Sequence, residues 1–167
     1  DVDVHILLSD KVKWRERGMK IVDGIEIEYF ANPVRRFPKC FHDNYRDGRR
    51  INARMFSIGK ILYDKYGDVA RIQKQARRMM HKKFRKPHPL GMEVMKYEIW
   101  DNLDNLKDVY ARKSSNFYYC YYFALYEILR TYCKYFQVEL PAPARLHRFL
   151  YDDKFLKNYL IKPFPDK

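Results

Sequence analysis

Cysteine, glycine and proline are all scarce in this chain. Of its 167 residues, three are cysteine, six glycine and eight proline, while hydrophobic residues make up 47%. This composition argues against a disordered chain and favours one with a buried core. The cysteines form an odd set without the spacing of a metal site, so we expect small buried hydrophobic side chains in a reducing cytoplasm. They are Cys40, Cys120 and Cys133.

Long hydrophobic runs and targeting signals are also missing. The longest aromatic stretch, residues 117–129, is too short to cross a bilayer and contains Glu127. The first residues include neither a basic segment nor a small-residue cleavage site, so no secretory signal is visible. We therefore expect a soluble, cytoplasmic protein that does not contact membranes.

Basic residues outnumber acidic residues, with 34 Lys and Arg against 21 Asp and Glu, for a formal net charge of +13. Three interpretations remain open: a groove for a nucleotide triphosphate, a surface for nucleic acid, or ordinary solvated helix faces. Charge alone does not choose between them. The basic pairs include Arg35-Arg36, Arg49-Arg50, Arg77-Arg78, Lys82-Lys83 and Arg85-Lys86.

Two aspartates begin the chain in an alternating pattern that continues into an apolar run. This pattern predicts a strand, on which Asp1 and Asp3 share one face about 6.6 Å apart, from a rise of about 3.3 Å per residue. Carboxylates in such an arrangement can bind hard cations such as Mg²⁺. The pair indicates phosphoryl or nucleotidyl transfer, although an Asp-x-Asp motif alone is a weak signal.

A hairpin can bring further carboxylates to these aspartates. The Asp23-Gly24 pair separates two strand-like runs, and such a pair is typical of a two-residue hairpin turn. In the second run, Glu26 and Glu28 lie on one face. A neighbouring strand could therefore supply a third carboxylate, and three converging carboxylates would need cations to neutralise them. The alternative is that both glutamates form the solvated face of a half-exposed hairpin.

These motifs resemble a known family. The sequence Asp-Val-Asp-Val is followed by Gly-Ile-Glu-Ile-Glu-Tyr-Phe-Ala-Asn-Pro and then by residues 55–64, Met-Phe-Ser-Ile-Gly-Lys-Ile-Leu-Tyr-Asp. Together they are similar to the nucleotidyltransferase superfamily that includes polymerase β. Within it, the chain resembles the bacterial aminoglycoside-nucleotidyltransferase-like proteins with a helical C-terminal domain. The resemblance covers most of the chain, but the motifs are short.

The resemblance implies a site, a cofactor and a reaction. Asp1 and Asp3 correspond to two metal-binding aspartates, and the third acid is Glu28 or, as second choice, Glu26. Two Mg²⁺ ions would brace the in-line transfer of a nucleoside monophosphate from a nucleoside triphosphate to an acceptor hydroxyl. The family's phosphate-binding Gly-Ser pair lies just before the first aspartate, whereas this sequence begins at Asp1. We therefore expect this sequence to be a piece of a longer protein. If it is not, we expect its activity to be doubtful.

The hydrophobic pattern predicts an α+β protein with two domains. A mixed-sheet nucleotidyltransferase domain, residues 1–86, would precede an all-helical bundle, residues 87–167, with the boundary at Pro87-His88-Pro89. Residues 59–64 read as a short apolar strand, and Asp68 as the cap of the next helix. In the second domain the pattern predicts helices over 92–110 and 117–136, the latter capped by Ser114 or Ser115, and short helices near 145–151 and 153–160.

In the resembling enzymes the helical domain leans over the sheet and the acceptor lies between them. Glu127, Asp101 and Asp104 are candidates for acceptor recognition, and Glu127 for the general base, whereas Arg130 and Lys134 could reach the triphosphate. A solvated acidic face with pairs inside the helix is the simpler interpretation. The tyrosines that begin the aromatic helix are expected to pack in the core, with nucleobase stacking as the alternative. They are Tyr118, Tyr119, Tyr121, Tyr122 and Tyr126.

Two other classes of function remain open. The protein could be a catalytically impaired module whose basic surface binds nucleic acid, or an interaction protein that holds a partner protein. The acceptor could be a small molecule such as an aminoglycoside, although a basic protein attracts a polycation poorly unless its cleft is locally acidic. An oligomer is possible. The histidines lack metal-ligand spacing, and Mg²⁺ prefers oxygen to the imidazole of His5, so none is assigned a role.

Overall fold

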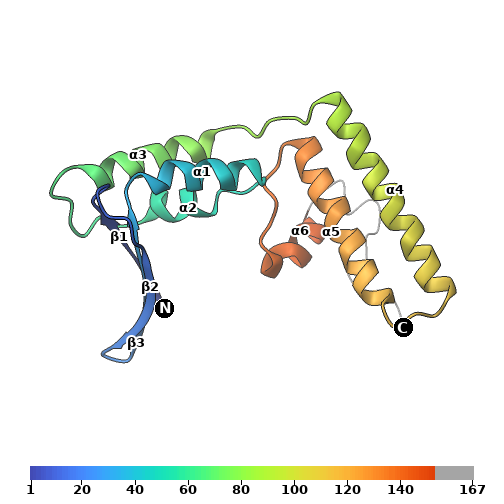
Figure 1. Ribbon diagram of the computed structural model, residues 1–167, viewed down its shortest axis with the longest axis horizontal. Helices are drawn as coiled ribbons and strands as arrows, with labels where there is room; N and C mark the ends of the chain where they lie inside the picture. The colour runs from blue at the N-terminus through green and yellow to red at the C-terminus, as the bar shows by residue number, and fades with distance from the viewer. Residues whose placement is uncertain (153–167) are drawn as a thin grey trace. The chain divides into compact units, whose positions relative to one another are not determined.

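The computed structural model describes residues 1–152 (Figure 1). The chain divides into two compact units, Asp1–Lys82 and Lys83–Lys167, with the described part of the second ending at residue 152. The first unit contains all of the described strands, and the described part of the second is helical. The protein is therefore of the α+β class, with a small mixed sheet and mostly helices.

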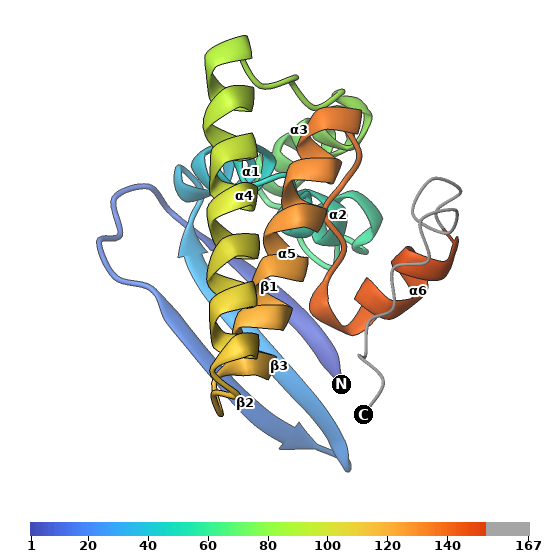
Figure 2. The same cartoon turned by 90° about the vertical axis from the view of Figure 1, so that its right-hand side faces the viewer.

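Three strands form the sheet of the first unit: β1 (Val2–Leu8), β2 (Glu16–Val22) and β3 (Ile25–Pro33). Strand β3 lies in the centre, parallel to β1 and antiparallel to β2, so the sheet is mixed (Figure 2). The predicted hairpin turn is confirmed. Asp23 and Gly24 have φ angles of 50° and 77°, as a two-residue turn with two positive φ angles requires.

A glycine in the middle of β2 makes room for an aromatic ring. Gly18 is paired with Tyr29 across the hairpin, and a Cβ added to Gly18 would lie 2.5 Å from the Tyr29 hydroxyl oxygen. The ring thus covers the bare glycine backbone. At its far end, the Tyr29 hydroxyl donates a hydrogen bond of 2.5 Å to Glu16 Oε1, and this bond raises the pKa of Tyr29.

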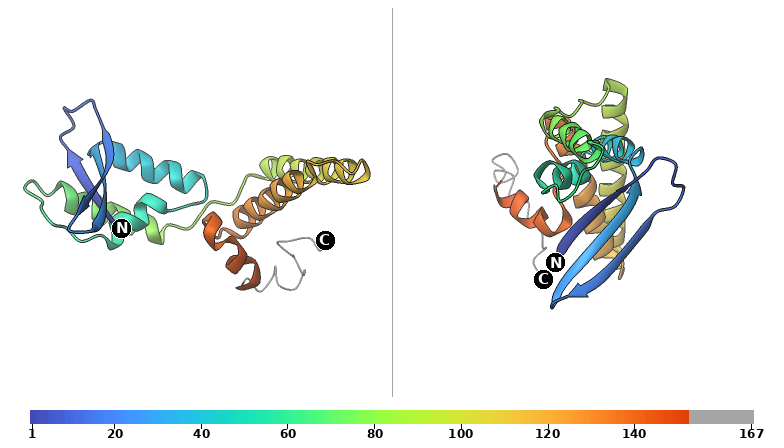
Figure 3. Two further views of the ribbon diagram at one scale, coloured as in Figure 1. Left: turned by 90° about the horizontal axis from the view of Figure 1, so that it is seen from below. Right: turned by 90° about the vertical axis from the view of Figure 1, so that its left-hand side faces the viewer.

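Three helices pack at one end of the sheet: α1 (Arg36–Arg46), α2 (Ile51–Ile58) and α3 (Asp68–His81). Figure 3 shows them on the side of the first unit away from the hairpin turn. Periodic apolar positions on each helix face inward, which explains why these segments are helical. The core that they form is made of Val34, Phe37, Phe41, Ala53, Phe56, Ile72 and Ala76.

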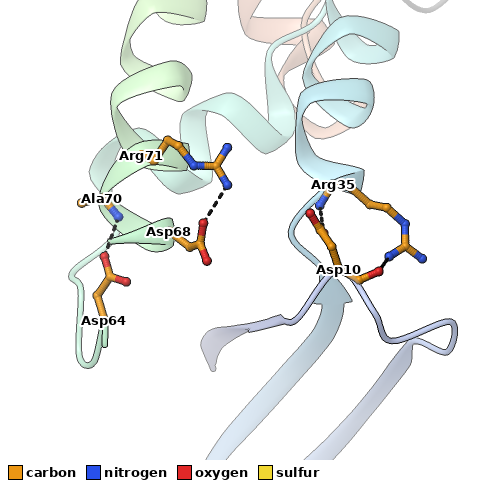
Figure 4. A network of polar contacts seen from close by, with 6 residues as sticks. All are labelled: Asp10, Arg35, Asp64, Asp68, Ala70 and Arg71. Carbon is orange, nitrogen blue, oxygen red and sulfur yellow. Dashed lines mark hydrogen bonds and ion pairs between the residues drawn. The ribbon is translucent and has the colours of Figure 1, made fainter. Parts of the chain in front are cut away.

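The expected strand at residues 59–64 is wrong, because this segment is a loop between α2 and α3. The segment pairs with none of the described strands, and the loop ends in a helix cap instead. The Asp64 carboxylate accepts a 2.8 Å hydrogen bond from the backbone N–H of Ala70, in the first turn of α3 (Figure 4). The cap expected at Asp68 is therefore supplied by Asp64, while Asp68 forms a 2.7 Å ion pair with Arg71.

A second contact in Figure 4 ties the loop after β1 to the start of α1. The backbone N–H of Arg35 donates a 2.6 Å hydrogen bond to Asp10 Oδ1. The Arg35 guanidinium donates to the carbonyl oxygens of Asp10 and Val12, the latter at 2.9 Å. Arg35 thereby fixes the direction in which the chain leaves the sheet.

The second unit is built on two long antiparallel helices, α4 (Pro89–Ala111) and α5 (Phe117–Phe136). A 3₁₀ turn, η1 (Pro143–Arg145), leads into α6 (Leu146–Asp152). The buried core consists of Leu125, Leu129 and Leu150, with Tyr121, Tyr132, Leu146 and Phe149 packed against it.

The helix boundaries in the second unit differ in detail from the expected ones. Asn116 is the N-cap of α5, and the Ser114 hydroxyl instead accepts a 3.2 Å hydrogen bond from the Asn116 N–H.

Of the three cysteines, Cys133 is buried and the other two are half-buried. The helix expected at 153–160 lies outside the described residues. Among residues 1–152, none of the helices has the length and apolar character needed to cross a membrane.

Candidate functional site

One face of the sheet carries all four carboxylates expected from the sequence. Because side chains alternate along a strand, Asp1 and Asp3 share this face with His5, and Glu26 and Glu28 share it with Phe30. The helices cover only the half of the face near His5. Asp1, Asp3 and Glu26 are exposed and Glu28 is half-buried, and the strand register places them toward the end that carries the hairpin turn.

The register of the parallel strands places Asp3 directly beside Glu28. Neighbouring strands lie about 4.8 Å apart, so these two carboxylates start from adjacent positions on one face. Glu26 lies two residues nearer the hairpin turn than Glu28 and is paired with Ile21 of β2. Asp1 immediately precedes β1 and lies two residues before Asp3, toward the same end of the sheet. The two pairs of acids therefore run in parallel along the uncovered half of the face.

An arginine from the third strand already engages Glu28. The Nε of Arg17 donates a 2.7 Å hydrogen bond to Glu28 Oε1, and a terminal nitrogen of the same guanidinium completes an ion pair. Its Cζ lies 5.0 Å from the centre of the Phe30 ring. Arg17 is thus held between an aromatic ring and a carboxylate, and it supplies the positive charge beside Glu28.

His5 anchors β1, the strand that carries Asp3, to the helices. Its ring stacks on Phe30 with centroids 5.0 Å apart and packs against Phe56 of α2 at 4.8 Å. Burial lowers the pKa of His5, and the nearby charge of Asp3 opposes this effect only in part. The His5 ring therefore fixes β1 against α2 two residues after Asp3.

The carboxylates of this face offer oxygen ligands of the kind that Mg²⁺ prefers. However, within residues 1–152 no group of three or more His, Cys, Asp or Glu side chains is placed to hold a metal ion. The arrangement brings Asp3 and Glu28 together as a pair, with Asp1 and Glu26 further along. Such a pair could bind one cation only if other oxygens, from water or from phosphate, completed its coordination.

The expected acceptor and triphosphate residues lie in the second unit. Glu127 of α5, with 13% of its side chain exposed, forms a 2.7 Å ion pair with Arg130, whose guanidinium also lies 4.0 Å from Glu98 of α4. This network joins the two long helices. Lys134 is half-buried one turn further along α5. The roles of Glu127, Arg130 and Lys134 in transfer stay predictions.

The other acidic candidates of α4 are exposed. Asp101 accepts a 3.2 Å hydrogen bond from Asn105, and Asp104 lies on the same solvated side of the helix. The tyrosines at the start of α5 are less buried than expected for a core. Tyr119 is 75% exposed and Tyr118 51%, whereas Tyr121 is half-buried against the core of the unit.

Sequence reasoning missed Arg17 and the anchoring role of His5. Arg17 could have been found by counting back from the turn, because a two-residue loop between Val22 and Ile25 fixes which residues face each other. That register puts Arg17 opposite Phe30 and diagonal to Glu28. The contact between His5 and Phe56 joins residues far apart in the sequence, so no local sequence pattern predicts it.

Comparisons with known proteins add no family to this description. The chain is matched by no family model, by no curated protein and by no solved structure.

Proposed function

We propose that this protein is a Mg²⁺-dependent nucleotidyltransferase, which moves a nucleoside monophosphate from a nucleoside triphosphate to an acceptor hydroxyl. The observation that supports this proposal is the register of β1 and β3, which sets Asp3 beside Glu28 on an uncovered sheet face. It agrees with the motif resemblance, in which two aspartates of one strand and an acid of its neighbour form the metal site.

Each acidic residue has a distinct place in the proposal. Asp1 and Asp3 would hold the metal ions, and Glu28 would be the third carboxylate ligand. Glu26, two residues earlier in β3, is the alternative to Glu28. Bound Mg²⁺ would neutralise the triphosphate and stabilise the charge that develops during transfer. Because Glu28 is ion-paired with Arg17, this guanidinium would have to turn away or move onto a phosphate when the metal binds.

Replacing a carboxylate of the site by an amide tests this proposal. Asp3→Asn and Glu28→Gln keep the size of the side chain but remove its charge. We expect each to lower nucleotidyl transfer at least about hundredfold, since loss of even an outer-shell partner of a metal costs about 10 to 100-fold. Transfer is measured with α-phosphate-labelled nucleoside triphosphates and Mg²⁺, with aminoglycosides and RNA oligonucleotides as acceptors, in the full-length protein.

A control and a second readout make the test independent of the acceptor. Asp47→Asn removes an exposed carboxylate at the end of α1 and should leave transfer unchanged. Mn²⁺, as a paramagnetic substitute for Mg²⁺, should broaden the amide NMR signals around Asp3 and Glu28 first. Wild-type transfer rates in Asp3→Asn, or broadening that is centred elsewhere, would contradict the proposed site.

A further inference from the structure

The entire net charge of the protein lies in one segment. Residues 35–86, which include α1, α2 and α3, contain 17 Lys and Arg against four Asp and Glu, a net charge of +13. The remaining residues contain 17 basic and 17 acidic residues and are neutral. A soluble surface usually mixes both signs, because a field of one sign destabilises the compact state by self-repulsion. Residues 35–86, most of which form the helical layer of the first unit, therefore depart from that pattern.

Helix α1 presents a basic stripe to solvent. Arg36, Lys39, His42 and Arg46 are all exposed, and they follow one another at intervals of three or four residues, which places them on one side of the helix. Within the described residues, neither Arg36 nor Lys39 has an acidic partner. Arg46 lies 4.0 Å from Asp43, at the limit of an ion pair.

Helix α3 has a second stripe of the same kind. Arg71, Lys74, Arg77 and Arg78 are exposed, while Ile72 and Ala76 on the opposite side are fully buried in the core. Arg71 is paired with Asp68. In the described part of the chain, Lys74 and Arg78 lack an acidic partner, and Arg77 bonds only to neutral groups, including the Gln73 side chain at 2.9 Å. These charges are available to a ligand.

The two helices meet at a corner where further basic residues gather. The Lys82 ammonium group, just after α3, lies 4.5 Å from the centre of the Tyr45 ring of α1. The Arg50 guanidinium donates a 2.7 Å hydrogen bond to the Lys82 carbonyl oxygen. Arg50 and Lys82 are thereby brought beside the last turn of α1, in which Arg46 follows Tyr45, so the fold concentrates the charge.

We propose that the basic stripes of α1 and α3, together with this corner, bind the phosphate backbone of a nucleic acid. A phosphodiester chain carries closely spaced negative charges, and a run of basic side chains spaced by about one helical turn, or about 5.4 Å, can neutralise several of them. A lipid surface fits less well. It would require apolar side chains among the basic ones, and neither α1 nor α3 exposes a large hydrophobic residue; those that residues 35–86 expose lie in α2 and in the loop between α2 and α3.

This surface is inferred from charge and exposure and does not depend on nucleotidyl transfer. It uses side chains of the helical layer, whereas the proposed transfer site uses carboxylates of the sheet. The two proposals can therefore fail separately. Should both hold, the nucleic acid becomes the first candidate for the acceptor.

Binding of a fluorescein-labelled single-stranded RNA of 20 nucleotides to the 167-residue chain tests the inference. From typical non-specific affinities, we expect a Kd of about 1 µM or lower at 50 mM KCl, rising steeply with salt. The triple variant Lys39→Gln, Lys74→Gln, Arg78→Gln removes exposed charges without an acidic partner among the described residues. It should bind at least about tenfold more weakly, and the slope of log Kd against log salt should fall by about 2, or about 0.7 per lost phosphate contact.

The matched control is Lys96→Gln, Lys107→Gln, Lys113→Gln, which lowers the net charge equally on exposed positions of the second unit. It should keep wild-type affinity, and so should Asp3→Asn. Absence of RNA binding at 50 mM KCl, an equal loss in both triple variants, or equally tight binding to phosphatidylglycerol vesicles would overturn the inference. Loss of transfer but not of RNA affinity in Asp3→Asn would support both proposals.

Discussion

Asp64 shows how one side chain determines where a helix begins. Its carboxylate accepts a 2.8 Å hydrogen bond from the backbone N–H of Ala70 in the first turn of α3, and this bond, with smaller contributions from neighbouring backbone N–H groups, lowers the pKa of Asp64. Gly67, the residue just before α3, has a φ of 75° and turns the chain so that the first backbone N–H groups of the helix point back at Asp64. The charge also faces the positive end of the helix dipole.

The lowered pKa makes the contribution of Asp64 depend on pH. A carboxyl group whose pKa is lower in the folded state stabilises that state above its unfolded pKa of about 3.9, and this contribution is lost as pH falls through the folded value. We therefore expect Asp64→Asn to lower the Tm at pH 7, and to narrow its difference from wild type as the pH falls below about 4. Thermal unfolding by circular dichroism measures both. A Tm difference that is constant down to the acid limit would show that the charge plays no part.

The hairpin is an element whose geometry follows from two residues. Asp23 and Gly24 both adopt positive φ angles, so the turn matches the twist of β2 and β3 and sets their register. That register brings Arg17 diagonally to Glu28 and places Gly18 beneath Tyr29. A change at the turn should therefore be felt along both strands.

Substituting the turn glycine should destabilise the first unit. A Cβ at Gly24 would meet no other atom within 4 Å, so Gly24→Ala tests the φ of 77° alone. We expect a loss of about 1 kcal/mol in the free energy of unfolding, measured by urea denaturation. Gly91→Ala, in the first turn of α4 with its nearest contact at 4.0 Å, is the control and should stabilise by about 0.5 to 1 kcal/mol. An unchanged free energy in Gly24→Ala would show that the turn is not strained.

At the scale of the molecule, each unit has its own hydrophobic core. Ile72 lies in the core of the first unit and Leu129 in that of the second, and both are completely buried. A core is what allows a unit to fold as a cooperative whole. The two units should therefore respond separately to the loss of core packing.

Ile72→Ala and Leu129→Ala test this independence. Each should cost about 2 to 5 kcal/mol, the usual range for such truncations in a packed core. In hydrogen exchange, Ile72→Ala should lower the protection of amides in residues 1–82, and Leu129→Ala that of amides in 83–152. Equal loss of protection in both units from either substitution would mean that the chain unfolds as one body.

Local signals predicted most of the elements of this fold. The Asp23-Gly24 turn, the alternation around Glu26 and Glu28, and the helical spacing that buries Ile72 and Ala76 were all readable from the sequence. The exception was the apolar run 59–64, read as a strand. Strand formation depends on a neighbouring strand, which the sequence of the run itself does not reveal.

The candidate site was less predictable than the fold. Alternation placed the acids on one face, but the register that sets Asp3 beside Glu28 depends on how β1 pairs with β3 across 25 residues of sequence. Contacts such as that of Arg17 with Glu28 need both the hairpin register and the length of the arginine side chain. The concentration of charge at the corner near Lys82 likewise arises from packing of α1 against α3.

With β3 in the centre, both β1 and β2 are outer strands, and among the described residues each has a single strand neighbour. One row of main-chain amides and carbonyls on each outer strand is not paired with another described strand, and such a row can pair with a further extended segment. The sheet can thus be widened by a further strand on either side without moving Asp3 and Glu28 relative to each other.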